Sequence, residues 1–242
     1  MPGWRTLGSA TLIVVLYLFI PLAFPDSLNP GAPLTQIGRD RICVTNGTVS
    51  ALPDGRLAIE TASSRGVVPG SDGTIAEIHF RYLGPTVAVK PLASGAVRRQ
   101  IGVKLRAHDA CNLLYAMWHI APDSKIEVSI KKNPTQHTSA ECHAAGYSIL
   151  KSSRIVAMPP IHPGEAHTMR VTLDGDNLAV IADRQEAWSG SINGGLDGIA
   201  GPAGFRTDNA RFEVEFLAVI PASGNPSDAN SNSTRCSGGR PT

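Results

Sequence analysis

A strict two-residue alternation of apolar and polar side chains limits the fold of this sequence more than any other feature. Successive side chains of a β-strand point to opposite faces, so this alternation indicates antiparallel strands with one face buried and one in water. Helical spacing competes over no usable length. The alternating segments are residues 75–83, 101–108, 125–131, 167–173 and 211–218.

Residues 112–120 (NLLYAMWHI) break this pattern because they are apolar on both faces. A strand covered on both sides lies in the middle of a sheet, and its second face needs a loop, a ligand or a partner to shield it. Trp118 and Tyr115 fall on opposite faces of this expected strand. At most one of the two rings can therefore line a site on the sheet surface.

The composition is that of one all-β domain. The chain has 242 residues, of which 42% are hydrophobic, enough for a sizeable core. The 24 glycines and 18 prolines fall between short apolar runs, as in turn-rich β proteins. The net charge of +2 gives no electrostatic footprint for nucleic acid. We predict an all-β, two-sheet antiparallel sandwich over residues 41–221.

Residues 1–24 predict a signal peptide or a signal anchor. Arg5 precedes an uncharged stretch over residues 7–24, and a basic start followed by an apolar run is typical of export. The uncharged length is close to the roughly 18 residues that span a bilayer, and Pro21 spoils a small-x-small cleavage site at Ala23. Cleavage and retention both stay open, with a buried core helix as a third interpretation. Arg5 favours the N-terminus inside, so we expect the domain outside the cytoplasm, membrane-anchored or secreted into the periplasm or medium.

Two further segments flank the expected domain. Residues 25–40 are rich in proline and glycine and are predicted to be a linker. Residues 222–242 are rich in serine, asparagine, glycine and proline, which is typical of a disordered tail. Nothing between residues 41 and 221 indicates a second linker or an internal repeat.

The last third of the domain carries an ordered set of turn and strand motifs. Residues 167–190 contain a strand, the Asp-Gly hairpin at 174–175, a second strand and Trp-x-Gly. Residues 201–219 add a glycine-rich approach, an Arg-Thr-Asp-Asn turn at 206–209 and a closing strand. This order resembles the laminin-G-like branch of the concanavalin A-like lectin/glucanase superfamily. Asp183-Arg184 stands where that family often has Asp-Gly.

The resemblance implies a jelly-roll sandwich of two curved sheets, with ligands on the concave sheet or at its loop rim. It does not fix a function, since the superfamily includes lectins, hydrolases and adhesion modules. Its glucanase branch carries a Glu-x-Asp-x-x-Glu strand, which is absent here. Glu213 and Glu215 share one face of the closing strand and could serve retaining glycoside hydrolysis, but a solvated outer face is the favoured interpretation. We therefore predict no catalytic residue.

Four cysteines form an even set in a chain expected to be exported, which suggests disulfides. We predict a bond between Cys111 and Cys142, joining the start of the doubly apolar strand to the loop after residue 131. The remaining pair, Cys43 and Cys236, would tie the tail to the first strand. No Cys-x-x-Cys occurs, and His137, Glu141 and His143 lack the spacing of a metal motif. No metal or cofactor is expected.

Polar groups gather beside the doubly apolar strand and form the candidate ligand site. A few convergent polar groups next to aromatic surface make a small-ligand site, in which rings stack on sugars and polar groups bind hydroxyls. The alternative is that Trp118 belongs to the core and that the charged groups form ion pairs. The candidate residues are Arg106, Asp109, Asn112, Tyr115, Trp118, His119, Lys131 and Asn133.

Together these features predict an exported or membrane-anchored, non-catalytic β-sandwich binding module. Its expected partners are a glycan or another cell-envelope component, and the membrane through the N-terminal segment, with no nucleic acid. Two alternatives stay open: an enzyme of the glycoside hydrolase or lyase type, and a structural domain that self-associates through the doubly apolar strand.

Overall fold

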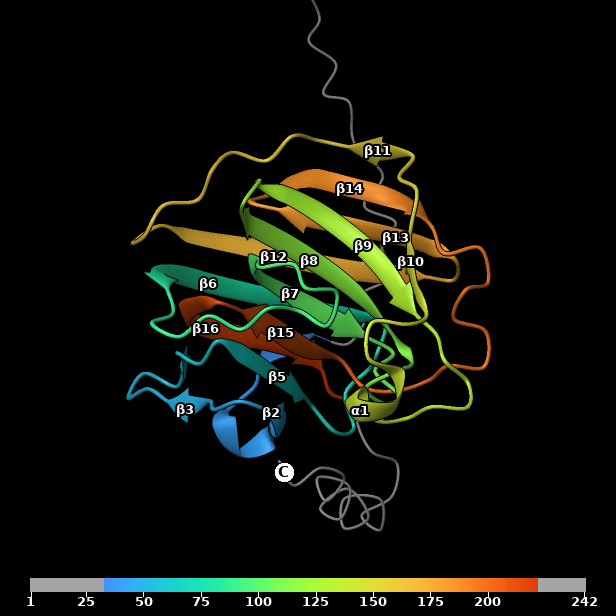
Figure 1. Cartoon of the computed structure of the whole chain (residues 1–242), viewed down its shortest axis with the longest axis horizontal. Helices are drawn as coiled ribbons and strands as arrows, with labels where there is room; N and C mark the ends of the chain where they lie inside the picture. Colours follow the sequence, from blue (N-terminus) through green and yellow to red (C-terminus); the bar gives the residue numbers. More distant parts are fainter. Residues whose placement is uncertain (1–32, 222–242) are drawn as a thin grey trace, which may run out of the picture. The chain divides into compact units, whose positions relative to one another are not determined.

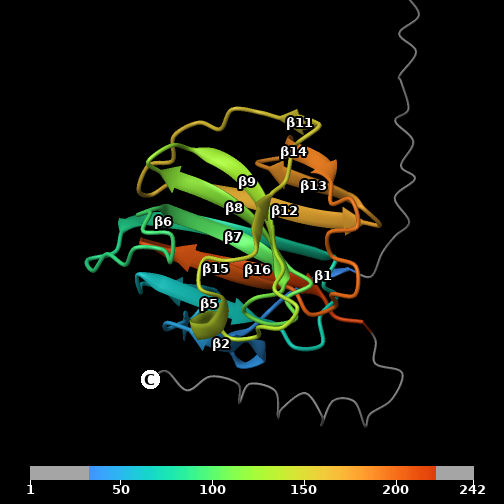
Figure 2. The ribbon, with the colours of Figure 1, turned by 45° about the vertical axis from the view of Figure 1, so that its right-hand side comes forward.

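The computed structural model describes residues 33–221. They form two antiparallel sheets packed face to face (Figure 1), and a view turned by 45° shows the same two layers (Figure 2). The predicted all-β, two-sheet antiparallel sandwich is confirmed. No helix in this part of the chain is long and apolar enough to cross a membrane. The predicted leader, the first part of the linker and the tail fall outside the described residues.

Sheet A has nine strands. Its edge strand β1 pairs only with β16. In spatial order, its strands are β11 (Arg154–Ile155), β14 (Gln185–Ser191), β13 (Asn177–Ala182), β12 (Ala166–Asp174), β6 (Ile75–Pro85), β16 (Ala210–Val219), β4 (Leu57–Ile59) and β3 (Ser50–Ala51), with β1 (Leu34–Gln36) beside β16.

Sheet B has seven strands and is the front layer in Figure 1. In spatial order, its strands are β10 (Tyr147–Ile149), β9 (Lys125–Lys131), β8 (Leu113–Ala121), β7 (Arg99–Leu105), β15 (Gly204–Asp208), β5 (Ser63–Val67) and β2 (Cys43–Asn46). Two short helical segments, η1 (Arg39–Arg41) and α1 (Ser139–Cys142), lie in the connections.

The alternating side chains account for the core between the sheets. Every second residue of β6 is buried, and the same holds for β16. Phe80 of β6 packs edge-on against Trp118 of β8, with ring centroids 5.7 Å apart. Such pairs add about 1 kcal/mol to the free energy gained by burying the rings. The contact joins one sheet to the other.

The predicted strands match the observed ones closely, with one instructive difference. Residues 125–131 coincide with β9, whereas the strand predicted over 101–108 ends at Leu105. Arg106 adopts a φ of +45°, which turns the chain out of the sheet. Its amide donates to Gly73 O at 3.0 Å and fixes the turn.

The doubly apolar segment is confirmed as an inner strand, because β8 lies between β7 and β9. Trp118 is 0% exposed and lies in the core between the sheets. Tyr115 points to the opposite face, where it joins a second, smaller apolar cluster. That cluster consists of Ala107, Leu113, Tyr115 and Met117, with Val67 packed against it.

The turn at Asp183-Arg184 forms without glycine. Both residues have positive φ, +47° and +69°, as the favoured two-residue hairpin between β13 and β14 requires. The Asp183 carboxylate accepts the Thr168 amide at 2.8 Å and bonds His167 Nδ1 at 2.7 Å. These bonds hold the turn in a conformation that arginine otherwise disfavours.

Candidate functional site

The face of sheet B turned away from the core carries the densest group of charged side chains on this sheet. Phe205, Val103 and Ala116 pair across neighbouring strands and belong to the core. Since side chains alternate along a strand, their chain neighbours point outward. We call this outward surface the sheet B face. Its strands contribute Arg65 and Val67 (β5), Arg206 and Asp208 (β15), Gln100 and Lys104 (β7), Tyr115 and His119 (β8), Glu127 and Lys131 (β9) and Tyr147 (β10).

Arg206 is the central group of the sheet B face. Its Nε donates to Asp208 Oδ2 at 2.7 Å and its Nη1 to the Tyr147 hydroxyl at 3.2 Å. Its guanidinium carbon lies 5.1 Å from the centre of the Tyr115 ring, a cation–π distance. Because β7 separates β15 from β8, the Arg206 side chain must extend over β7 to reach the Tyr115 ring. It does so where β7 presents Gly102, which is paired with Arg206.

The glycine at position 102 is a steric requirement. A Cβ there would lie 2.6 Å from Met117 Sδ and closer still to the Ala116 carbonyl oxygen. The sheet B face therefore has a low point on β7, bordered by the longer side chains of its neighbours. Arg206 remains charged in this setting. Burial opposes its charge and is the largest single influence, but Asp208, Tyr115 and Tyr147 together outweigh burial and raise the pKa of Arg206 above its ordinary value.

Asp208 is the carboxylate that holds these side chains in place. It is 1% exposed and accepts hydrogen bonds from three donors on three strands. Arg206 Nε and Gln100 Nε2 each donate to Oδ2 at 2.7 Å, and Arg65 Nη2 donates to Oδ1 at 3.2 Å. Hydrogen bonds from charged guanidinium groups are stronger than neutral ones, so Asp208 firmly joins side chains from β5, β7 and β15.

Lys104 has no such partner. It is 5% exposed, and no acceptor among the described residues bonds its Nζ. Burial, together with the charges of Arg65 and Arg206, lowers the pKa of Lys104 to about 7. An ammonium group in this position is expensive to keep charged.

Two tyrosines form the aromatic part of the face. The Tyr115 and Tyr147 rings stack with centroids 6.0 Å apart and planes at 25°. Tyr147 is 40% exposed, and Lys131 Nζ lies 5.1 Å from its ring centre. Burial of the hydroxyl, followed by the neighbouring Tyr115, raises the pKa of Tyr147 to about 12, so the phenol is neutral.

The far end of the face holds an ion-pair cluster around Glu127. Arg98 and Lys125 donate to its two oxygens at 3.0 and 2.9 Å, and His119 Nε2 lies 3.7 Å away. Burial and the nearby Arg98 and Lys125 lower the pKa of His119 to about 4 despite Glu127, so this histidine is neutral at pH 7. Burial opposes the charge of Glu127, but Lys125 and the other cations outweigh it and lower its pKa. Glu127 therefore carries no proton to donate at neutral pH.

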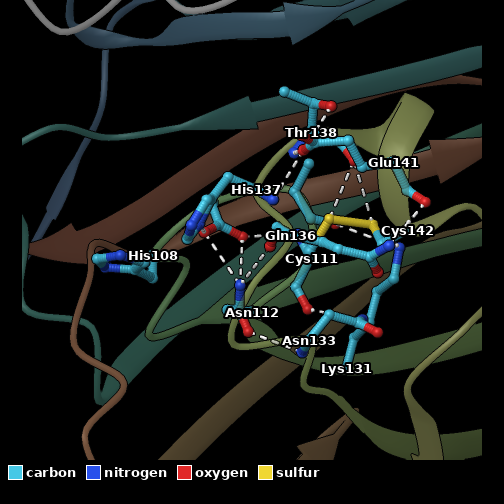
Figure 3. Close-up of polar contacts among 12 residues, drawn as sticks. His108, Cys111, Asn112, Lys131, Asn133, Gln136, His137, Thr138, Glu141 and Cys142 are labelled. Carbon is cyan, nitrogen blue, oxygen red and sulfur yellow. Dashed lines mark hydrogen bonds and ion pairs between the residues drawn. A yellow bond between two sulfur atoms is a disulfide. The ribbon is translucent and has the colours of Figure 1, made fainter.

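A closed polar network supports the loop after β9 (Figure 3). Asn112 Nδ2 donates to Asp109 at 2.9 Å and to Gln136 O at 3.0 Å, while its Oδ1 accepts the Asn133 amide at 2.8 Å. His137 Nδ1 bonds the same Asp109 at 2.7 Å. These groups satisfy one another, and the network acts as a brace for the loop.

The predicted disulfide between Cys111 and Cys142 is confirmed, with Cα atoms 6.0 Å apart. Lys131 lies beside it, donating to His143 O at 2.9 Å and contacting Cys142 Sγ at 2.9 Å. The bond fixes α1 to the start of β8. The second expected pairing includes Cys236, which lies outside the described residues.

The structure separates the eight candidate residues into four settings. Tyr115, His119 and Lys131 lie on the sheet B face. Asp109, Asn112 and Asn133 brace the loop after β9. Trp118 lies in the core, as the alternative interpretation had it, and Arg106 forms the turn after β7. Ligand binding by these residues stays a prediction.

Sequence reasoning missed eight residues of the face: Arg65, Val67, Gln100, Lys104, Glu127, Tyr147, Arg206 and Asp208. The segment 206–209 was expected to be a turn, but Arg206 and Asp208 are part of β15, and only Asn209, at φ +52°, turns the chain. Alternation within 204–208 is the signal that could have placed Arg206 and Asp208 on one face. No local signal marks Tyr147, since β10 has only three residues.

The outer face of sheet A holds the two carboxylates considered for hydrolysis. Glu213 pairs with Arg56 at 2.7 Å, and Glu215 with His79 at 3.0 Å. A shallow depression of about 180 Å³ lies beside them. It is lined by Arg56, His79, Phe80, Arg81, Ala166, His167, Thr168, Asp183 and Glu213. The two glutamates thus belong to a charged, partly solvated surface.

No protein family matches this sequence, and no curated protein matches it either. Among solved structures it is similar to the carbohydrate binding module CBM66 from Bacillus subtilis, with a TM-score of 0.50 and 14% identity over 72% of this chain and 92% of that chain. It is also similar to domain 4 of AbnA, a GH43 extracellular arabinanase from Geobacillus stearothermophilus, with a TM-score of 0.43 and 12% identity over 73% and 80%. At this identity the likeness to the Bacillus module shows the fold alone, a jelly-roll sandwich.

Proposed function

We propose that this chain is a non-catalytic glycan-binding module and that the sheet B face is its binding surface. The observation that carries the proposal is the Tyr147 ring, which is 40% exposed and backed by Tyr115. The flat apolar face of a sugar stacks on such a ring. A charged donor beside it, Arg206, bonds the Tyr147 hydroxyl and is the group that we assign to hydroxyl or acidic oxygens of the sugar.

The fold is compatible with this role. The similar Bacillus structure is described as a carbohydrate binding module, and membership of the concanavalin A-like superfamily is part of our proposal. A fold shared at 14% identity does not assign a ligand. The side chains of the sheet B face therefore carry the proposal.

Binding suits these side chains better than hydrolysis does. Glycoside hydrolysis needs one carboxylic acid that donates a proton and a second carboxylate that acts as nucleophile or base. On the sheet B face, Asp208 accepts from two arginines, and Glu127 from Arg98 and Lys125. Although burial opposes the charge of Glu127, the cations around it lower its pKa, so this carboxylate is a poor proton donor at neutral pH.

The location of the module is part of the same proposal. The basic start and apolar run in residues 1–24 support export, with the sandwich displayed outside the cytoplasm as a secreted or anchored protein. Envelope or extracellular polysaccharides are then the available ligands. A reporter enzyme that is active only after export, fused after residue 40, tests this, and activity confined to the cytoplasm would refute it.

The binding surface is tested with Tyr147→Ala and a matched control, Ile155→Ala. Ile155 is more exposed, at 57%, and lies on β11 of sheet A. We expect a glycan array and calorimetry to detect binding by the full chain. Loss of the ring should weaken binding roughly tenfold, equivalent to about 1.4 kcal/mol, while the control binds normally. The proposal would be wrong if the full chain bound no neutral or acidic polysaccharide, or if both variants lost the same binding affinity.

A further inference from the structure

Three cations from three neighbouring strands lie on the sheet B face, and one of them bonds the exposed Tyr147. They are Arg65 of β5, Arg206 of β15 and Lys104 of β7, and we call them the cationic cluster. Arg65 and Arg206 are paired across β5 and β15. Both act electrostatically on Lys104, and both also act on Lys131, one strand beyond β8. The cluster is therefore a single charged unit.

One carboxylate serves the whole cationic cluster. Asp208 pairs with Arg206 at 2.7 Å and with Arg65 at 3.2 Å, and no other carboxylate among the described residues forms an ion pair with any of the three cations. Asp109 acts on Lys131 from the loop side and does not pair with the cluster. Three positive groups thus face one negative group. Like charges this close repel strongly where water is partly excluded.

Lys104 is the cation of the cluster that has no carboxylate partner among the described residues. Its side chain is nine-tenths buried, its ammonium group has no acceptor among the described residues, and its nearest charged neighbours are cations. A purely structural position of this kind is better served by an apolar residue, because a buried unpaired charge costs stability. An anionic group from a bound ligand would pair with the Lys104 ammonium group and offset the cost of burying its charge.

The cluster is open to such a group on one side. The Arg65 side chain is 22% exposed, and Tyr147, bonded to Arg206, is 40% exposed. A ligand lying on the Tyr147 ring would extend over Arg206 toward Lys104. Arg206 Nη2 and Arg65 Nε take no part in the hydrogen bonds of these two side chains to Asp208, Tyr147 and Ser63, so each can donate to an oxyanion. The lysine adds a point charge.

We propose that the cationic cluster binds an anionic group carried by the glycan, a carboxylate or a phosphate ester on the sugar that stacks on Tyr147. This inference rests on the proposed function and specifies its ligand class. A nucleic acid is the other common polyanion, but the chain as a whole carries a net charge of only +2. The cluster fits one acidic sugar residue.

The test measures calorimetric binding of the full chain to trigalacturonate, to mannose 6-phosphate and to the neutral galactotriose. The variant Lys104→Met removes the unpaired charge and keeps the length of the side chain. Lys151→Met is its control, since it removes one charge from an exposed site between β10 and β11. Arg65→Gln is a second test of the cluster at a more exposed position, should Lys104→Met fold poorly.

We expect an acidic sugar to bind at least tenfold more tightly than galactotriose, with an affinity that falls as salt is added. Lys104→Met and Arg65→Gln should each weaken that binding roughly tenfold, whereas Lys151→Met should not. The stronger of the two acidic sugars identifies carboxylate or phosphate as the bound group.

Two results would overturn the inference. Equal binding of acidic and neutral sugars, with no effect of Lys104→Met or Arg65→Gln, removes the anion site but leaves glycan binding intact. Tighter binding of short oligothymidylate than of any sugar assigns the cluster to nucleic acid instead. A protein that binds no sugar in the array fails the proposed function itself, which is a separate outcome.

Discussion

Replacing Lys104 by methionine should stabilise the folded protein at neutral pH. The pKa of Lys104 falls from 10.5 to about 7 on folding, mainly through burial. Each pKa unit corresponds to about 1.4 kcal/mol, so the shift represents a cost of roughly 5 kcal/mol when the lysine is charged in both states. Apolar replacements of buried charges gain about 1 to 4 kcal/mol in practice. We expect Lys104→Met to gain an amount within that range at pH 7.

The sign of the pH dependence follows from proton binding. Between pH 7 and 10.5 the unfolded chain holds the Lys104 proton and the folded chain does not. The free energy of unfolding of the wild type therefore rises with pH in this window, by up to about 1.4 kcal/mol per unit from this group. Below pH 7 both states are charged and the full cost is present. The advantage of Lys104→Met should be largest there and shrink toward pH 10.

Urea unfolding followed by circular dichroism at several pH values between 6 and 10 measures this difference. Other lysines and tyrosines titrate alike in both proteins, so the difference between the two curves isolates Lys104. Exposed Lys151→Met should change stability by less than about 0.5 kcal/mol at every pH. A Lys104→Met protein that is less stable at pH 7, or a gain that does not change with pH, would refute our account of this side chain.

Three further changes test other parts of the fold. Replacing Cys111 and Cys142 by alanine opens a loop with a sequence separation of 31 and should lower the free energy of unfolding by about 4 kcal/mol; an unchanged urea midpoint would contradict this. Arg184→Gly relieves a φ of +69° and should raise stability by about 0.5 to 1 kcal/mol, seen as a higher Tm. Asn112→Ala leaves Gln136 O and the Asn133 amide without their partner and should cost about 2 to 3 kcal/mol; amide hydrogen exchange should show this loss first in the loop after β9.

The strands could be predicted from sequence because burial imposes its own period. Residues 125–131 alternate and coincide with β9, and the doubly apolar run at 112–120 lies, as expected, in the middle of a sheet. The faces of that run were also separated correctly. Which face meets the other sheet depends on strands distant in the sequence, so Trp118 and Tyr115 could not be assigned to core and surface in advance.

The site was harder to predict because its residues come together only through strand order. Arg65 and Arg206 are paired although 141 positions separate them in the sequence (206 − 65). Alternation predicts on which face of the sheet a side chain lies, but it does not predict which strands pair with one another. Asp109 and Asn112 were selected because they are polar and close to β8, and the bonds that turn them into a brace were invisible in the pattern.

The position of Tyr147 has a consequence for where such a protein can work. Its strand, β10, has three residues at the rim of sheet B and begins five positions after Cys142. If the disulfide is reduced, the short rim strand loses the anchor that precedes it. The Tyr147 ring would then no longer be held in its stacked position on Tyr115, while the two sheets of the sandwich stay folded. The affinity for ligand would therefore fall on reduction of the disulfide before circular dichroism shows any unfolding.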